Sequence, residues 1–435
     1  MSFSLSSFPA PALSRRRLLA LGAGLATLPF GGLHAQSAPR QVVDVADEAA
    51  LRAALGQAGP GTLIRLAPGS YPRLPIRALR GEPGAPIVLT SADPANPARI
   101  GRLRVRDCAH VSFEKLVFDY SFEPEHKYTF KAFSLVNTEG AVIADCRFEG
   151  DQAQGTGKPQ DGFGWAFCLG LTRCRETVVF RNLFHGFTTG LSCNDCRHLQ
   201  ILANRMHSMR VDGMNFAQVQ DLRVEANHIT EFLRSPEDRG HPDMIQFWTT
   251  RTKRPSARIV IRKNLLNSGN GPYSQSIFIR NEMVDTGKAG REMFYRDMLI
   301  EENLIINAHL HGITVGETVG LTIRNNTLIR NPRSDGPKKN PQLYTPTIRV
   351  KERCENVEVL RNIAPKVPKP RRAGGWDIRD NALIQDKRRG VSNHYDALFV
   401  NALNGDPHDI SNFYYRAGGV LDGAGLGAGW LQPEG

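Results

Sequence analysis

The chain has little of what a membrane-spanning or disulfide-stapled protein requires. Its only long apolar run, Ala20 to Leu33, lies near the N-terminus, so we expect no membrane span in the rest of the 435 residues. Seven cysteines, an odd number, argue against a complete disulfide framework. With 41% hydrophobic residues and 23% charged residues, the composition is neither that of a disordered chain nor that of a fibrous one. The sequence therefore predicts a folded chain with a substantial core.

Acidic residues are also scarce relative to basic ones. The chain has 43 Asp and Glu against 55 Lys and Arg, which gives a formal charge of +12. Such an excess favours an anionic partner, namely nucleic acid, anionic lipid or an acidic polymer. No nucleic-acid reader motif is present in the sequence, so we do not expect a nucleic-acid partner.

The N-terminus has the layout of an export signal of the twin-arginine type. Arg15, Arg16 and Arg17 precede the apolar run, and small residues near Ala35 suit a cleavage site. We therefore interpret residues 1–35 as a removed signal and expect the protein to be periplasmic or secreted. Because this segment holds three arginines and no acid, its removal lowers the charge from +12 to about +9 and keeps its sign.

A repeat organises the middle of the chain. A short segment of alternating apolar residues ends in asparagine and recurs every 22 to 39 residues. The seven repeated asparagines are Asn182, Asn204, Asn227, Asn264, Asn303, Asn326 and Asn362. A period near 22 with insertions on one face is typical of a β-solenoid, and we predict an all-β, right-handed parallel β-helix. We expect each asparagine to adopt the left-handed conformation at a bend and to bond the next coil's asparagine.

Other repeated features predict the interior and the ends. Cys108, Cys174, Cys196 and Cys354 precede repeat strands at similar offsets, which indicates stacked buried thiols, with a Cys174–Cys196 bridge as an alternative. Residues 47–55 have a helix start signal and apolar residues at helical spacing, so we expect a capping helix. We assign residues 36–435 to one domain, with 36–75 as the N-terminal cap and first coil and 365–435 as the C-terminal cap.

Two family resemblances follow from particular stretches. Asp47, Gly61 to Tyr71 and Pro86 to Thr90 are similar to the opening of the alginate lyase and chondroitinase B group, which implies a right-handed parallel β-helix that cleaves polysaccharide. A second set resembles, in order, the motifs of polygalacturonase-type hydrolases, which implies a pair of catalytic aspartates. Its members are Val211-Asp212-Gly213, Pro242-Asp243, His311 to Gly316 and Ile348 to Lys351.

Aligning the strand that precedes each asparagine segment predicts one functional face. Residues that alternate with the inward apolar positions point outward and form a polar, aromatic and basic strip. They are Ser192, Asn215, Gln246, Phe278, Thr314 and Arg349, with Trp248, Arg280 and Lys351 two places further on. The longest insertions, around 234–241, 281–296 and 331–344, fall between these strands, and we expect them to wall a groove.

Two aspartates occupy matching positions where these strands begin. Asp212 and Asp243, stacked in successive coils, would share a proton, a cation or an arginine, since two adjacent carboxylates repel. They are candidate Ca²⁺ ligands, a candidate acid and base pair of a glycosidase, or turn caps. His241 and His311 lie nearby and are candidate catalytic bases.

The remaining candidates suit an acidic sugar. Arg280 can hold a carboxylate by two contacts, or it can pair with Glu282 and order its loop. We group Arg280 and Lys351 with the two histidines as catalytic candidates. The predicted substrate-binding residues are Asn215, Gln246, Trp248, Asn281 and Arg349, with Trp248 stacking on a sugar face.

These residues fit, first, a polysaccharide lyase that cleaves a uronate-containing polymer by β-elimination. That chemistry needs a cation on the uronate carboxylate and a base for the adjacent C–H proton. The alternatives are a hydrolase that uses Asp212 and Asp243, a non-catalytic carbohydrate-binding solenoid, and an epimerase that shares the lyase's first step. In each case we expect an anionic polysaccharide partner and a monomer.

Overall fold

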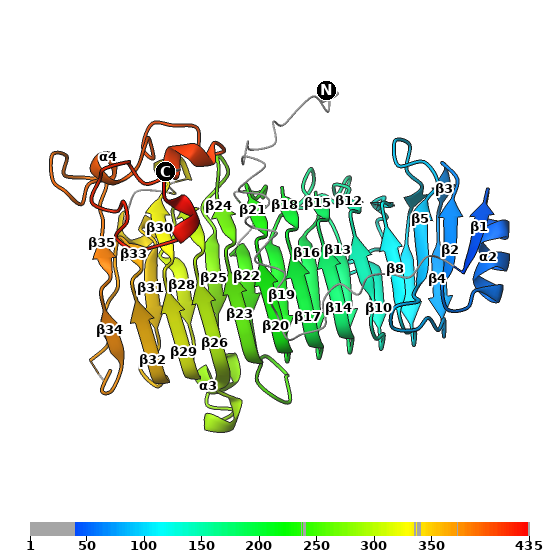
Figure 1. Ribbon diagram of the computed structural model, residues 1–435, viewed down its shortest axis with the longest axis horizontal. Helices are drawn as coiled ribbons and strands as arrows, with labels where there is room; N and C mark the ends of the chain where they lie inside the picture. Colours follow the sequence, from blue (N-terminus) through cyan, green and yellow to red (C-terminus); the bar gives the residue numbers. More distant parts are fainter. Residues whose placement is uncertain are drawn as a thin grey trace.

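Three parallel sheets wind around one elongated core. The computed structural model describes residues 40–433 except 236, 238–240, 335, 337–340 and 372, so the predicted export signal lies outside the described residues. Each turn of the chain, here called a coil, contributes one strand to each sheet, and the coils stack along the long axis (Figure 1). The expected all-β parallel β-helix is confirmed.

The three sheets are named A, B and C. Sheet A contains β1 (Gln41–Val45), β2 (Thr62–Leu66), β5 (Ile87–Ser91), β8 (Val111–Glu114), β11 (Val142–Ala144), β14 (Arg175–Phe180), β17 (Arg197–Leu202), β20 (Gln220–Glu225), β23 (Ala257–Arg262), β26 (Tyr295–Glu301), β29 (Thr318–Arg324), β32 (Glu355–Leu360) and β34 (Asp377–Arg379). Sheet B contains β3 (Ser70–Tyr71), β6 (Arg99–Ile100), β9 (Val117–Asp119), β12 (Arg147–Glu149), β15 (Leu183–His185), β18 (Arg205–His207), β21 (His228–Thr230), β24 (Leu265–Asn267), β27 (Leu304–Asn307), β30 (Thr327–Arg330), β33 (Ile363–Ala364) and β35 (Ala382–Leu383). Sheet C contains β4 (Leu74–Arg77), β7 (Leu103–Arg106), β10 (Lys131–Val136), β13 (Phe167–Thr172), β16 (Thr189–Asn194), β19 (Asp212–Ala217), β22 (Asp243–Phe247), β25 (Gln275–Ile279), β28 (His311–Val315) and β31 (Thr347–Val350).

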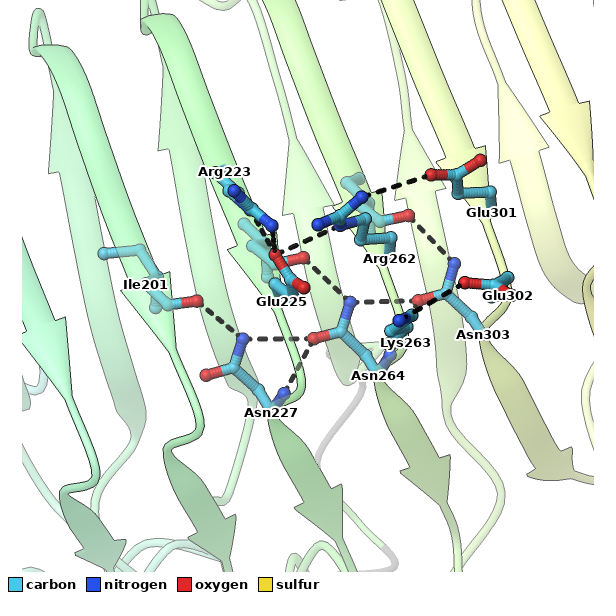
Figure 2. A network of polar contacts seen from close by, with 12 residues as sticks. Ile201, Arg223, Glu225, Asn227, Arg262, Lys263, Asn264, Glu301, Glu302 and Asn303 are labelled. Carbon is cyan, nitrogen blue, oxygen red and sulfur yellow. Dashed lines mark hydrogen bonds and ion pairs between the residues drawn. The ribbon is translucent and has the colours of Figure 1, made fainter. Parts of the chain in front are cut away.

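A buried asparagine ladder ties the coils together. The side-chain oxygen of Asn264 accepts from the backbone amide and the side-chain amide of Asn227, each at 3.0 Å. The side-chain nitrogen of Asn264 donates to the Val224 carbonyl at 3.0 Å. It also donates to Asn303 at 2.9 Å, and Figure 2 shows the row formed by Asn227, Asn264 and Asn303. The predicted bonds between coils are confirmed, and Asn381 adds a further rung beyond Asn362.

The predicted backbone conformation of these asparagines is wrong. The left-handed residue is the one immediately before each asparagine, as in Arg181, Ala203 and Lys263, which have φ between 53° and 54°. The asparagine itself then points its side chain into the core, where both of its polar ends find backbone and neighbouring asparagine partners. The residue before each asparagine thus makes the bend, and the asparagine itself makes the hydrogen-bonding ladder.

A helix covers the N-terminal end of the solenoid, and the C-terminal segment covers one face of its last coils. Helix α2 (Glu48–Gln57) confirms the predicted capping helix, and Asp47 caps it by accepting the Ala50 amide at 2.8 Å. After β35 the chain turns back along the outer face of sheet B, with the short helix α4 (Tyr395–Leu398) in this segment (Figure 1). Apolar residues there pack on outward-facing residues of β27, β30 and β33 and form a second core.

The cysteines belong to the main core. All seven are buried free thiols, and the Cys174 amide lies 3.4 Å from the Cys196 sulfur without a disulfide between the two residues. Stacked thiols, the first of the two alternatives, are therefore what the structure contains. Within the described part of the chain, no helix has the length and apolarity needed to cross a membrane.

The asparagine ladder makes a stability prediction. We expect Asn264→Ala to lower the free energy of unfolding by about 2–5 kcal/mol, because it removes the partners of a buried amide and a buried carbonyl. Chemical denaturation measures this loss. Asn401→Ala, at an exposed position, is the control and should change little. Equal losses of unfolding free energy in the two variants would show that the asparagine ladder does not stabilise the fold.

Candidate functional site

The outward face of sheet C carries the candidate site. Backbone pairing places the predicted outward residues Asn215, Gln246, Phe278, Thr314 and Arg349 in one row along successive strands. Inward neighbours such as Met214, Ile245 and Ile313 are fully buried. Loops from sheet B reach the beginnings of these strands and loops to sheet A leave from their ends. The insertions therefore lie on both sides of the row.

Asp212 and Asp243 form a buried carboxyl pair at the beginnings of β19 and β22. They are direct partners in the backbone register. Each is bonded by the amide side chain three residues further along its own strand. Asn215 donates to Asp212 at 2.8 Å, and Gln246 donates to Asp243 at 2.7 Å. These two predicted substrate-binding amides thus already have protein partners.

Burial governs the charge of this pair. It raises the pKa of Asp212 to about 7, against the opposing hydrogen bond from Asn215. The pKa of Asp243 is raised well above its usual value by burial, then by the neighbouring Asp212 and by Glu282. The Asp243 side chain is 0% exposed. The pair therefore carries less than its full two negative charges at neutral pH, and Asp243 has no surface to offer a polymer.

A cavity of about 310 Å³ lies further along the same face. It is open between β25, β28 and β31 and is bordered by the loop after β25, which contains the short helix α3 (Glu282–Asp285). Its polar lining brings together Arg280, Asp285, His311, Arg349 and Lys351, with Phe278 as the apolar floor. Five of the predicted site residues line it, with Asn281 as a buried member of the wall, whereas the aspartate pair lies outside it.

One carboxylate organises the cations of the cavity. Asp285 accepts from Arg280 Nε at 3.0 Å and from Lys351 Nζ at 3.3 Å. Arg349 is exposed, and within the described part of the chain no carboxylate forms an ion pair with it. The cavity therefore keeps an excess of positive charge, because two cations share one carboxylate and Arg349 has none.

His311 stands beside this free charge as a neutral imidazole. Burial, then Arg349 and His241, lower its pKa from 6.5 to about 4. Its Nδ1 lies 2.8 Å from the Thr314 hydroxyl, and its ring lies 4.8 Å from Phe278. At neutral pH it has a lone pair available to accept a proton.

Several predicted residues are placed differently from the way the sequence suggested. Asn281 is fully buried, where it donates to the Met293 carbonyl at 2.8 Å and accepts from the Thr249 hydroxyl at 3.0 Å, so it holds the loop. Arg280 does not pair with Glu282, which instead accepts from the Thr249 amide at 2.8 Å. Trp248 is partly exposed just beyond β22, and His241 is exposed before that strand.

Sequence reasoning missed two residues, one in the cavity and one beside His311. Asp285 stands five positions after Arg280, and its role depends on α3 turning back toward β31. His309 lies beside His311, with ring centroids 5.2 Å apart, and stacks on Tyr273 at 5.8 Å. His309 could have been identified from the sequence because it lies two residues before His311, which was already a candidate.

The aspartate pair supplies carboxyl oxygens that a metal ion could bind, but two carboxyl groups alone do not make a complete metal site. Among the described residues, no group of three or more His, Cys, Asp or Glu side chains is arranged to hold a metal ion. Three buried acceptors around the pair nevertheless lack a hydrogen-bond partner: Asn215 Oδ1, Asp243 Oδ1 and Gln275 Oε1. Such hard oxygen donors are the type that Ca²⁺ prefers.

The chain is similar to several solved structures at low identity. The chain is similar to an alginate lyase from Paenibacillus sp. str. FPU-7, at 12% identity over 78% of this chain and 99% of that chain, with a TM-score of 0.43. It is similar to the PL6 family alginate lyase AlyGC at 15% identity over 80% of this chain, spanning 52% of that chain, with a TM-score of 0.44. It is also similar to PfbA, a surface adhesin of Streptococcus pneumoniae, at 12% identity over 77% and 87% of the two chains, with a TM-score of 0.45.

These similarities concern the fold alone, which both lyases and an adhesin possess. No protein-family model matches the chain, and no curated protein matches its sequence. Any assignment of chemistry therefore rests on the residues of the site.

The buried carboxyl pair predicts an unusual pH dependence of stability. A folded pKa near 7 for Asp212 means that folding favours the protonated form. The stabilisation is complete below the unfolded value near 4 and is lost as the pH rises through 7. We expect Asp243→Asn to raise the free energy of unfolding at pH 8 by about 1–3 kcal/mol and to change it little at pH 4.

Denaturation of chelator-treated protein at both pH values measures this effect. The control is Asp221→Asn, because a hydrogen bond from Arg258 lowers the pKa of Asp221 and this variant should lose stability at pH 8. A loss of stability at pH 8 in Asp243→Asn as well would contradict the protonated pair.

Proposed function

We propose that the cavity binds an acidic sugar of an anionic polysaccharide and that the protein is a lyase that cleaves the chain by β-elimination. The observation that carries this proposal is the neutral His311 beside the unpaired Arg349 in one cavity. The first group can accept a proton and the second can neutralise a uronate carboxylate. The net charge of +12 supports an anionic substrate.

In this reaction Arg349 binds the uronate carboxylate through two parallel hydrogen bonds, which makes the adjacent C5–H proton more acidic. His311 accepts that proton through its Nε2 lone pair. The electrons of the broken C5–H bond form the C4=C5 double bond while the C4–O bond to the next sugar breaks. The departing oxygen then takes up a proton, and Lys351, which Asp285 holds in the cavity, is a suitable donor.

Substrate binding tunes the base. In the free protein Arg349 contributes to the low pKa of His311. A bound carboxylate offsets that charge, so the pKa of His311 rises toward neutrality in the complex and the imidazole becomes a stronger base when it is needed. Arg280, Asn215, Gln246, Trp248 and His241 would contact neighbouring sugars along the face, and Asn281 would position the loop.

A hydrolase is the second candidate, because the pKa of Asp212 near 7 suits a general acid at neutral pH. The complete burial of Asp243 opposes it, since an inverting hydrolase needs both carboxyl groups to face the bond and a water. A non-catalytic binding solenoid would bind polymer and release no product.

Ca²⁺ between Asp212 and Asp243 is a separate proposal, supported by the three unpartnered oxygens nearby. Because the ion needs ionised carboxylates, it would compete with the shared proton and bind more tightly as the pH rises. A rise in melting temperature on adding Ca²⁺ at pH 8, absent in Asp243→Asn, tests it. Export to the periplasm or outside the cell and a monomeric state remain predictions from the sequence.

Product formation tests the lyase. We expect a uronate polymer to acquire the ultraviolet absorbance of a C4=C5 double bond, with His311→Ala and Arg349→Gln lowering kcat/KM by at least about 100-fold. Arg296→Gln, on sheet A, is the control and should retain full activity. If the absorbance of His311→Ala increases at the rate of the parent protein, His311 is not the catalytic base.

The pH profile tests the tuning of the base. We expect kcat/KM, which reports the free protein, to fall only below about pH 4, because His311 stays neutral down to its pKa of about 4. The acid limb of kcat, which reports the complex, should lie at a higher pH. Coincident limbs, or a kcat/KM limb near pH 6.5, would exclude this role for His311.

A further inference from the structure

The face of sheet C carries a second cationic area at its opposite end. In β7 the side chains alternate, with Leu103 and Val105 buried and Arg104 and Arg106 exposed. Among the residues that the structure describes, no carboxylate forms an ion pair with either arginine, whereas Arg77 nearby has Asp107 at 3.8 Å. Two uncompensated charges therefore stand together, far from the cavity.

Arg104 and Arg349 belong to one row. Pairing from strand to strand connects them through eight steps of backbone register. At about 4.8 Å a step, the two arginines are about 38 Å apart. The seven positions between them are neutral and mostly small: Ser134, Gly170, Ser192, Asn215, Gln246, Phe278 and Thr314. An anionic chain on this row would meet no acidic side chain in it between its two cationic ends.

An aromatic group borders the second area. The loop between β9 and β10 places the Phe130 ring 6.0 Å from the Arg104 guanidinium and 5.4 Å from that of Arg102. His126 stacks on Phe130 with ring centroids 3.7 Å apart. Tyr128, in the same loop, is 51% exposed. Arg102 pairs with Glu123, so Arg104 is the guanidinium beside this ring that is left to bind the carboxylate of an acidic sugar.

We propose that Arg104 and Arg106, bordered by the loop that holds Phe130, form a second binding site for the same anionic polysaccharide chain that enters the cavity. This inference rests on the proposed function for the identity of the occupant. A long chain engages both sites at once, and the second contact is favoured because the first holds the chain close. A short oligosaccharide reaches only the cavity.

Binding measured apart from cleavage tests this second site. All variants carry His311→Ala, so that the polymer stays intact, and affinity electrophoresis is run at low salt with alginate, pectate, glucuronan and long glycosaminoglycans. We expect Arg104→Gln with Arg106→Gln to weaken polymer binding by about tenfold and to leave the affinity for a short oligosaccharide of the same sugar unchanged. The control pair, Arg197→Gln with Arg296→Gln, removes the same charge from exposed positions on sheet A and should have no effect.

Each result decides the question. Unchanged polymer affinity in the Arg104 and Arg106 variant, an equal loss for the short oligosaccharide, an equal loss in the control pair, or no binding of any tested polymer would overturn the second site. A selective loss for the polymer supports it. If that loss occurs but the protein with His311 restored releases no product, the second site stands and the lyase proposal fails.

Discussion

The register between stacked coils is the constraint on which the rest of the structure depends. Parallel strands repeat at a fixed spacing, so residues that are 22 to 39 positions apart in sequence become direct neighbours. The asparagine ladder secures that register from inside, because each rung satisfies a backbone amide of the preceding coil and is itself satisfied by the next. A coil that slipped by one residue would bury its outward polar row and expose its apolar one.

The same stacking creates the two electrostatic features of the sheet C face. Identical positions in adjacent coils bring Asp212 and Asp243 together, and burial then resolves their repulsion by keeping protons on the pair. One coil beyond Asp243, the loop that holds α3 brings Asp285 against Arg280 and Lys351 and leaves Arg349 without a carboxylate partner beside His311. The chemistry we propose therefore depends on which charges the loops neutralise as much as on which residues the strands present.

The part of this arrangement that repeats was predictable from sequence. Alternation and equal spacing gave the inward column of Met214 and Ile245 and the outward row of Gln246 and Arg349, because strand geometry has one solution for that pattern. Loop structure was not predictable in this way. The burial of Asn281, the partner of Glu282 and the bridging role of Asp285 all arise from one non-repeating insertion whose path no periodicity specifies. The left-handed conformation at Arg181, Ala203 and Lys263 could not be predicted, because arginine, alanine and lysine have no preference for it.

The most direct measurement of the proposed chemistry is a count of two products in one digest of a uronate polymer. New reducing ends and new C4=C5 double bonds are quantified in the same sample over time. Elimination by His311 and Arg349 predicts one double bond for every new reducing end at all times. Reducing ends that accumulate without double bonds would contradict elimination and would show that the protein is a hydrolase.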